Sequence, residues 1–186
     1  MSRYVSLLLA LALLGVPCSL STNANPGLFV DVSTHFIEVP AGAQNGSSSI
    51  RLAATLYEPR FLPSAPAAIY IHGWGGRRLT GSDNLAYYIA AAGYTVLSYT
   101  ARGFGGGESG GRVTLAGPDE INDLKHVIDW LIADPDRVIG PRVTKIGVVG
   151  GSYGGGHGFQ ISNDPRVSAV IPLVGWTDLE QSLFPN

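Results

Sequence analysis

A short apolar run, Ile146-Gly147-Val148-Val149, leads directly into the sequence Gly150-Gly151-Ser152-Tyr153-Gly154. The run has the composition of a strand that is buried on both faces of a parallel sheet. A serine flanked by glycines two positions before and two after it, between a strand and a helix, is typical of a strained turn that lifts the hydroxyl above the sheet. Both flanking positions must be small because the turn folds them against each other. Ser152 is therefore the candidate nucleophile.

The helix expected after Ser152 contains four glycines, at positions 154, 155, 156 and 158. Each glycine costs about 1 kcal/mol of helix propensity relative to alanine. A helix that accepts several of them packs too closely for side chains, or serves something other than stability. Its N-terminus also directs free N–H groups and a positive dipole end toward the serine. The alternative interpretation is a glycine-rich turn that carries an inert serine.

A second glycine motif, His72-Gly73-Trp74-Gly75-Gly76, follows an apolar run that ends at Ile71. In serine hydrolases of the α/β type, the loop after the third strand supplies one N–H of the oxyanion hole, and the residue after the nucleophile supplies the other. The motifs therefore predict the N–H groups of Trp74 and Tyr153 as oxyanion donors. His72 is expected to order this loop rather than to act as a base. An ordinary turn is the alternative.

The rest of the chain alternates strands and helices after an antiparallel start. Residues 34–39 and 50–57 alternate apolar and polar side chains and predict an antiparallel pair, and residues 60–66 are interpreted as a connector. Further strands are predicted at 67–71, 94–99, 144–149 and 167–173, with helices at 83–92 and 119–133. This order predicts an α/β domain with a mainly parallel sheet.

The composition of the chain excludes several classes of function. The chain has 186 residues, of which 45% are hydrophobic, and its net charge is −2. These values fit one folded domain and leave no basic field for a nucleic acid partner. A single cysteine, Cys18, excludes an internal disulfide framework and a multi-cysteine metal site. Glycines in the loop at 102–111 have dinucleotide-fingerprint spacing, but the next helix begins only near Asp119, so no nucleotide cofactor and no metal are expected.

The first residues have the pattern of a secretory signal peptide. Arg3 precedes an apolar run over residues 4–16, and small residues at 22–24 offer a cleavage site. The run is shorter than the ~20 residues of a membrane span. We therefore expect a signal peptide at 1–24, a catalytic domain at 25–186, and a secreted, periplasmic or extracellular protein with no stable membrane span after processing. An uncleaved anchor is the alternative.

Several stretches together resemble the catalytic domain of the Xaa-Pro dipeptidyl-peptidases and cocaine-esterase-like hydrolases, within the α/β-hydrolase superfamily. The resemblance covers roughly residues 30–186 and implies an α/β-hydrolase fold, Ser152 as nucleophile and a small peptide or ester substrate. Members of this group often use a tyrosine hydroxyl as the second oxyanion donor. This chain has Trp74 at that place, so the resemblance implies a backbone N–H as the donor there instead. The stretches are 70–75, 102–105 with 109–110, 123–130, 150–156, 164–167 and 176–179.

The proton acceptor and its orienting acid are harder to assign. In this superfamily the chain order is serine, acid, histidine. After Ser152 the only histidine is His157, which is expected to face away from the hydroxyl, and the available acids are Asp164 and Asp178. By resemblance both partners and the last strands lie further along, so we expect these residues to be the N-terminal part of a larger hydrolase or a truncated gene product. A non-catalytic secreted module that keeps the hydrolase shape is the alternative function.

Arg102, Asp119 and Asp123 are expected to form a structural ion pair across the glycine-rich loop. The choice between peptidase and esterase activity, and the oligomeric state, are left open by the residues.

Overall fold

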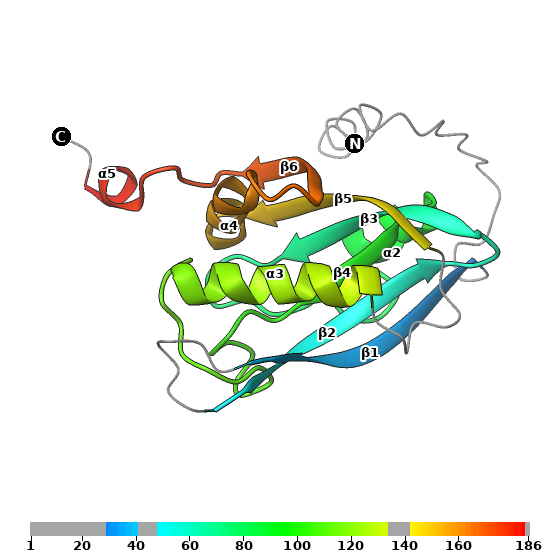
Figure 1. Cartoon of the computed structure of the whole chain (residues 1–186), viewed down its shortest axis with the longest axis horizontal. Coiled ribbons are helices and arrows are strands. Elements are labelled where there is room, and N and C mark those ends of the chain that lie inside the picture. The colour runs from blue at the N-terminus through cyan, green and yellow to red at the C-terminus, as the bar shows by residue number, and fades with distance from the viewer. Residues whose placement is uncertain (1–28, 41–47, 134–141, 185–186) are drawn as a thin grey trace.

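The computed structural model describes residues 29–40, 48–133 and 142–184 and shows a six-stranded sheet with the order β1-β2-β4-β3-β5-β6 (Figure 1). The expected signal segment with Cys18 and most of the predicted loop after β1 lie outside the described residues. The strands are β1 (Val30–Val39), β2 (Ile50–Pro59), β3 (Ser64–Ile71), β4 (Thr95–Tyr99), β5 (Arg142–Gly151) and β6 (Val167–Leu173).

The sheet is antiparallel where the chain begins and parallel afterwards. β1 pairs with β2 and β2 pairs with β4 in antiparallel register, whereas β3 is parallel to both β4 and β5, and β5 is parallel to β6. The fold class and the antiparallel start predicted from the sequence are confirmed. The parallel strands place their carboxyl ends at one edge of the sheet, where ligands bind in open α/β sheets.

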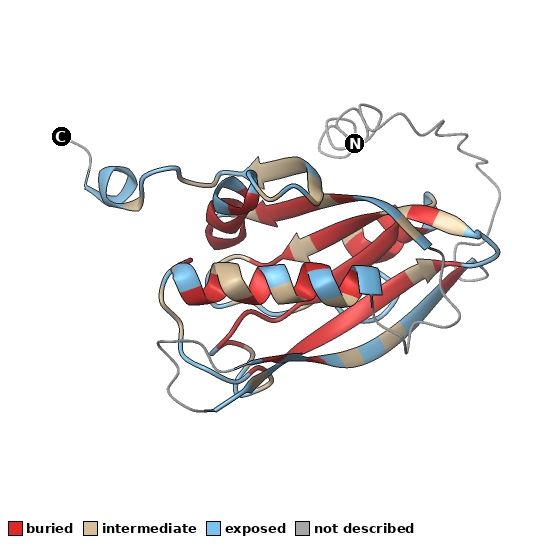
Figure 2. Ribbon diagram, viewed as in Figure 1, coloured by how far each residue is buried: buried red, intermediate tan, exposed pale blue. Residues whose placement is uncertain are grey.

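Helices cover both faces of the sheet. α2 (Leu85–Ala91) packs on one face with Tyr57, Ala68 and Val96, while α3 (Pro118–Ala133) and α4 (Tyr153–Ile161) cover the other (Figure 1). The central strands and the inner sides of these helices are buried (Figure 2). α5 (Leu179–Leu183) buries no residue and lies away from the sheet. The core therefore lies on both faces of β3, β4 and β5.

The prediction that residues 60–66 only connect two strands is wrong at its end, because β3 begins at Ser64. Pro66 misled the interpretation, since proline cannot donate to a sheet and normally argues against a strand. In the structure the register between β3 and β5 shifts between Ala65 and Ala67, and the pairing with β4 starts only at Ala67. The bulge accommodates Pro66, because a bulge leaves a residue unpaired and proline within a sheet is confined to such positions, to edge strands and to strand starts.

The predicted ion pair is confirmed and is buried. Arg102 is inaccessible to solvent, and its Nε and Nη2 donate to the two carboxylate oxygens of Asp123 at 2.7 and 2.5 Å. Its Nη1 lies 3.1 Å from Asp119 Oδ2. Removing one partner of such a pair costs about 3–5 kcal/mol because it leaves a charge uncompensated. The pair attaches the glycine-rich loop after β4 to the first turns of α3.

Candidate active site

Ser152 lies on a sharp turn between β5 and α4. Its backbone has φ 52° and ψ −112°, in the left-handed half of conformational space, where a residue other than glycine is strained. Its N–H donates to Leu173 O at 2.8 Å, which anchors the turn to β6. The side chain is exposed and does not cap the helix. The hydroxyl is therefore presented to solvent at the carboxyl edge of the sheet.

Close backbone contacts explain the glycines on both sides of Ser152. A Cβ on Gly150 would lie 2.6 Å from the carbonyl of Gly154, and one on Gly154 would lie 2.3 Å from Ile71 O. Further along α4, a Cβ on Gly155 would meet Gly175 Cα at 2.7 Å. Of the two explanations given for these glycines, the contacts support close packing at positions 154 to 156, and they join α4 to β3 and to the segment after β6.

The loop after β3 lies beside the serine. A Cβ on Gly73 would be 4.0 Å from Ser152 Cβ, and Gly76 N–H closes a turn onto Gly73 O at 3.0 Å. Trp74 occupies the second position of that turn, whose N–H the closing bond leaves unused. Tyr153 is the first residue of α4, so its N–H has no acceptor within the helix. The two predicted donors are thus on backbone segments that flank Ser152.

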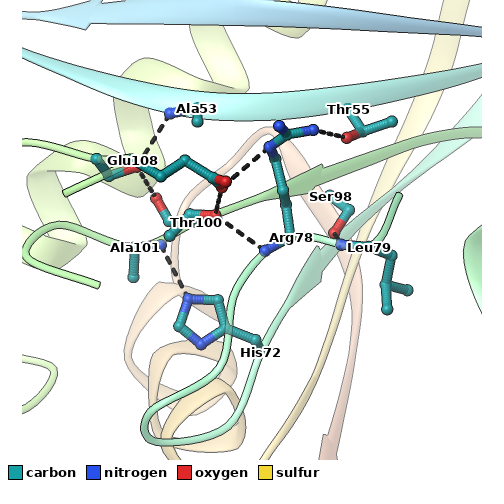
Figure 3. Close-up of polar contacts among 10 residues, drawn as sticks. Ala53, Thr55, His72, Arg78, Leu79, Ser98, Thr100, Ala101 and Glu108 are labelled. Carbon is teal, nitrogen blue, oxygen red and sulfur yellow. Dashed lines mark hydrogen bonds and ion pairs between the residues drawn. The ribbon is translucent and has the colours of Figure 1, made fainter. Parts of the chain in front are cut away.

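His72 holds the start of this loop with both ring nitrogens. Its Nδ1–H donates to Gly73 O at 2.7 Å. Its Nε2 accepts from Ala101 N–H at 3.0 Å (Figure 3). Burial lowers the pKa of His72 below its ordinary value, which favours the neutral ring that this pair of bonds requires. This geometry agrees with the expectation that His72 orders the loop.

The far end of the loop is attached to Ser98 in β4 and to Thr100 directly after it (Figure 3). Arg78 N–H donates to Thr100 Oγ1 at 2.9 Å, and Leu79 N–H donates to Ser98 Oγ at 2.8 Å. The Arg78 guanidinium then bridges Glu108 Oε1 at 3.0 Å and Thr55 Oγ1 at 2.5 Å. The segment from His72 to Leu79 is therefore fixed at both ends, while the Trp74 side chain between them is 59% exposed.

Three aromatic rings, Trp74, Phe104 and Tyr153, form an aromatic cluster. Trp74 and Tyr153 meet edge to face with centroids 5.7 Å apart, and Phe104 lies 5.1 Å from Trp74 and 5.3 Å from Tyr153. Edge-to-face pairs of this kind contribute about 0.5–1.5 kcal/mol beyond the area they bury. The two residues predicted to hold the oxyanion therefore contact each other through their side chains, which the sequence did not indicate.

The candidate base and acids after Ser152 all form hydrogen bonds to residues other than Ser152. His157 is buried, its Nδ1–H donates to Tyr153 O at 2.9 Å, and burial lowers its pKa. Asp164 binds Arg166, which lowers the pKa of this carboxyl to about 2. Asp178 Oδ1 accepts Gln181 N–H at 2.9 Å and caps α5. No hydrogen bond joins Ser152 to any of the three within the described part of the chain, so no triad is assembled there.

Sequence reasoning missed three charged residues that support the site, namely Arg78, Glu108 and Glu120. A signal existed only for Glu120, which is the third residue of α3, the position at which a glutamate reaches back to the N–H that precedes the helix. Arg78 and Glu108 are 30 residues apart and have no local pattern that pairs them.

The described residues form neither a metal-binding cluster nor a membrane-spanning helix. Across the described ranges, no three histidine, cysteine, aspartate or glutamate side chains are grouped to hold a metal ion. No helix among those same residues combines the length and apolar character needed to cross a bilayer.

The strand order and the serine at the end of β5 are those of the α/β-hydrolase fold, and solved structures with this fold superpose on the chain. They include the Pyrococcus furiosus esterase Pf2001, with TM-score 0.60, 22% identity and coverage of 84% of this chain and 56% of that one. A ferulic acid esterase from Streptomyces cinnamoneus has TM-score 0.62 and 18% identity, with 85% and 62% covered. Residues 46–186 match the model of the X-Pro dipeptidyl-peptidase (S15) family, and the chain belongs to that family.

Curated relatives are longer than this chain. The quorum-quenching protein AidA of Acinetobacter baumannii (strain MDR-ZJ06) is 31% identical over 146 residues, which are 76% of this chain and 45% of that protein. An uncharacterised 31.7 kDa protein of Escherichia coli, from the traX-finO intergenic region, is 30% identical over 128 residues, or 68% of this chain and 43% of that protein. The chain thus spans less than half the length of these relatives.

Proposed function

We propose that the complete gene product is a serine hydrolase that transfers an acyl group from an ester or amide to water, with Ser152 as the nucleophile. The observation that carries this proposal is the strained, exposed Ser152 beside a loop held at both ends. The N–H groups of Trp74 and Tyr153 flank it, and neither is used by the turn or helix to which it belongs. Family membership and the esterase fold of the structural neighbours support hydrolase chemistry of the α/β type.

In the proposed reaction Ser152 Oγ forms a bond to the substrate carbonyl carbon, and the carbonyl electron pair moves onto oxygen. The N–H groups of Trp74 and Tyr153 donate to that oxyanion, and each such donor typically contributes a factor of about 10²–10³ in rate. When the intermediate collapses, the bond to the alcohol or amine breaks and the leaving group takes the proton that Ser152 gave up. Water then attacks the acyl-enzyme and releases the acid.

The base that receives the Ser152 proton is proposed to lie outside these 186 residues. Of the four histidines, His72 uses both ring nitrogens in hydrogen bonds to the backbone. His157 is buried, and its Nδ1–H donates to Tyr153 O. His35 lies on β1, four strand spacings from β5 and so about 19 Å away at about 4.8 Å per spacing. His126 lies in the middle of α3. The greater length of the curated relatives supports this proposal.

A fluorophosphonate probe tests the assignment, because it reacts with a serine only where that serine is activated. We expect the complete gene product to be labelled at Ser152 and the Ser152→Ala variant not to be labelled. Ser109 is a suitable control, since its hydroxyl is buried between Ala53 N–H and Thr100 O, and Ser109→Ala should keep the label. If the Ser152→Ala variant were still labelled, the assignment of Ser152 as the nucleophile would be wrong. Comparing the turnover of an Xaa-Pro anilide with that of a nitrophenyl ester then distinguishes peptidase activity from esterase activity.

A second function is kept because one observation favours it: the described residues assemble no triad. In this alternative the chain is a secreted module that binds ligands with a hydrolase shape and has no turnover. A serine hydroxyl without a base is a weak nucleophile near pH 7. The 186-residue chain by itself should therefore be nearly silent toward a nitrophenyl ester, and the two functions differ in whether the complete gene product is active.

The proposed location is outside the cytoplasm, on the signal-peptide pattern of residues 1–24. Mass spectrometry of the N-terminus of the expressed protein tests this, and we expect the mature chain to begin at Asn25. A protein that retains Met1 in the cell pellet would contradict the proposal.

A further inference from the structure

A buried carboxylate, Glu120, connects the start of α3 to the turn that carries Ser152. Its side chain is almost wholly enclosed, and each of its two oxygens accepts two hydrogen bonds. Oε1 accepts from Thr114 N–H at 2.5 Å and from the Tyr153 hydroxyl at 3.3 Å. Oε2 accepts from the Thr114 hydroxyl and from Gly117 N–H at 2.9 Å. Four donors fill the acceptor capacity of a carboxylate.

Three of the four bonds have a local purpose. They hold the segment from Thr114 to Gly117, where Leu115 and Ala116 both adopt φ of 59° and need their surroundings to keep them there. The bond from Gly117 N–H is also the half of a capping box in which the third helical residue reaches back to the residue before the helix. This part of the arrangement explains α3 and its preceding turn without reference to catalysis.

The fourth bond extends beyond that purpose, because it leaves α3 and reaches the residue after Ser152. The Tyr153 ring is buried among Trp74, Phe104 and His157, and its hydroxyl has no other partner among the described residues. The backbone N–H of Tyr153 is the proposed oxyanion donor, and the preceding residue, Ser152, has a strained backbone. A strained conformation persists only where its neighbours over-determine it.

Resting on the function proposed above, we propose that Glu120 is a positioning residue that acts through Tyr153. Its carboxylate holds the Tyr153 hydroxyl, which fixes the ring in the aromatic cluster and keeps the Tyr153 N–H directed toward the forming oxyanion. Small displacements of such groups cost rate without abolishing binding. The bond therefore acts on kcat and leaves KM nearly unchanged.

The test deletes one hydroxyl at a time in the complete gene product. Tyr153→Phe removes only the donor to Glu120, and Tyr99→Phe is the matched control, because Tyr99 is also buried but its hydroxyl has no partner among the described residues. We expect Tyr153→Phe to lower kcat and the rate of fluorophosphonate labelling about three- to tenfold, with KM within about twofold of wild type. Tyr99→Phe should match wild type in both.

A double-mutant cycle identifies Glu120 as the partner. Glu120→Gln places an amide N–H₂ where a carboxylate oxygen accepted, and it should lower kcat in the wild-type background more than in the Tyr153→Phe background. Equal effects in both backgrounds would mean that Glu120 serves only the turn before α3. If Glu120→Gln does not fold, the comparison of Tyr153→Phe with Tyr99→Phe still decides the proposal.

Hydrogen exchange gives a readout that does not depend on activity. We expect the peptide over residues 150–157 to exchange about threefold faster or more in Tyr153→Phe than in Tyr99→Phe, because the turn opens locally. If Tyr153→Phe exchanges faster but the fluorophosphonate does not label Ser152 in the complete gene product, the positioning role is supported while the nucleophile assignment fails. Wild-type exchange and wild-type kcat in Tyr153→Phe, with Ser152 labelled, would overturn the positioning role and leave the proposed function intact.

Discussion

The Cα of Gly154 lies so close to the carbonyl of Ile71 that a Cβ added to Gly154 would be 2.3 Å from Ile71 O. Gly154 is in the first turn of the helix after Ser152, and Ile71 ends the strand that leads into the Trp74 loop. The nucleophile and the predicted oxyanion donor are thus positioned by contact between two backbones. Because backbones in a sheet and a helix hardly move, their separation does not depend on side-chain rotamers.

This contact predicts a large difference between two alanine substitutions in the same helix. Gly154→Ala forces β3 and α4 apart and should lower the free energy of unfolding by about 1–3 kcal/mol, as overpacking does. Gly158→Ala places a Cβ 3.9 Å from Pro172 Cβ, an ordinary contact, and should be neutral or stabilising by up to about 1 kcal/mol through helix propensity. Urea denaturation measures both. Similar values for the two variants would contradict the close approach.

The strained backbone of Ser152 predicts that removing its Cβ stabilises the fold. A residue held at such dihedrals costs about 1–3 kcal/mol, and glycine relieves that cost while adding unfolded-state entropy of about 0.4–1 kcal/mol. Ser152→Gly should therefore raise the free energy of unfolding by about 1 kcal/mol. Ser152→Ala keeps the Cβ and is the control, which should stay near wild type. A glycine variant less stable than the alanine variant would show that the turn is not strained.

The buried imidazole of His72 predicts a loss of stability in mild acid. Burial lowers the pKa of His72, so as the pH falls below about 6.5 the unfolded chain takes up a proton that the folded chain refuses. The free energy of unfolding should then decrease between pH 7 and pH 5. His72→Gln offers an amide oxygen to Ala101 N–H without titrating, and its decrease should be smaller. Part of the decrease should persist because the pKa of His157 is lowered in the same way. Urea denaturation at several pH values measures this. If the free energy of unfolding of His72→Gln decreased as much between pH 7 and pH 5 as that of wild type, His72 would be excluded as a source.

The apolar side chains after β6 predict association of the 186-residue chain. Within the described sheet β6 is an edge strand, and Val174 just beyond it is 88% exposed. Exposed apolar edges promote association, and charged residues prevent it. Val174→Lys should shift the chain toward monomer in sedimentation. Phe61→Lys is the control, since Phe61 is 86% exposed with a similarly positive φ but lies between β2 and β3. An equal effect at both positions would point to general solubility instead.

The sequence was sufficient for the features that depend on neighbours along the chain. Period-two and apolar runs predicted each strand of the described sheet, and β6 was predicted with its observed bounds, 167–173. The glycines around Ser152 predicted the turn and its crowding, because a tight turn excludes Cβ atoms wherever it occurs. The start of β3 was missed because only pairing with β5 reveals the bulge at Pro66. The roles of Ser152, Trp74 and Tyr153 in catalysis stay predictions until they are tested.

Tertiary structure alone decided how the site is supported. Glu120 and Tyr153 are 33 residues apart, and Arg78 and Glu108 are 30 apart. No local propensity relates residues so far apart, since their approach depends on the order of strands and on which face each helix covers. The same holds for the backbone contact of Gly154 with Ile71, although a glycine at that position was expected. Local patterns encode elements and tight turns, whereas the partners of a buried polar side chain are chosen only when those elements pack.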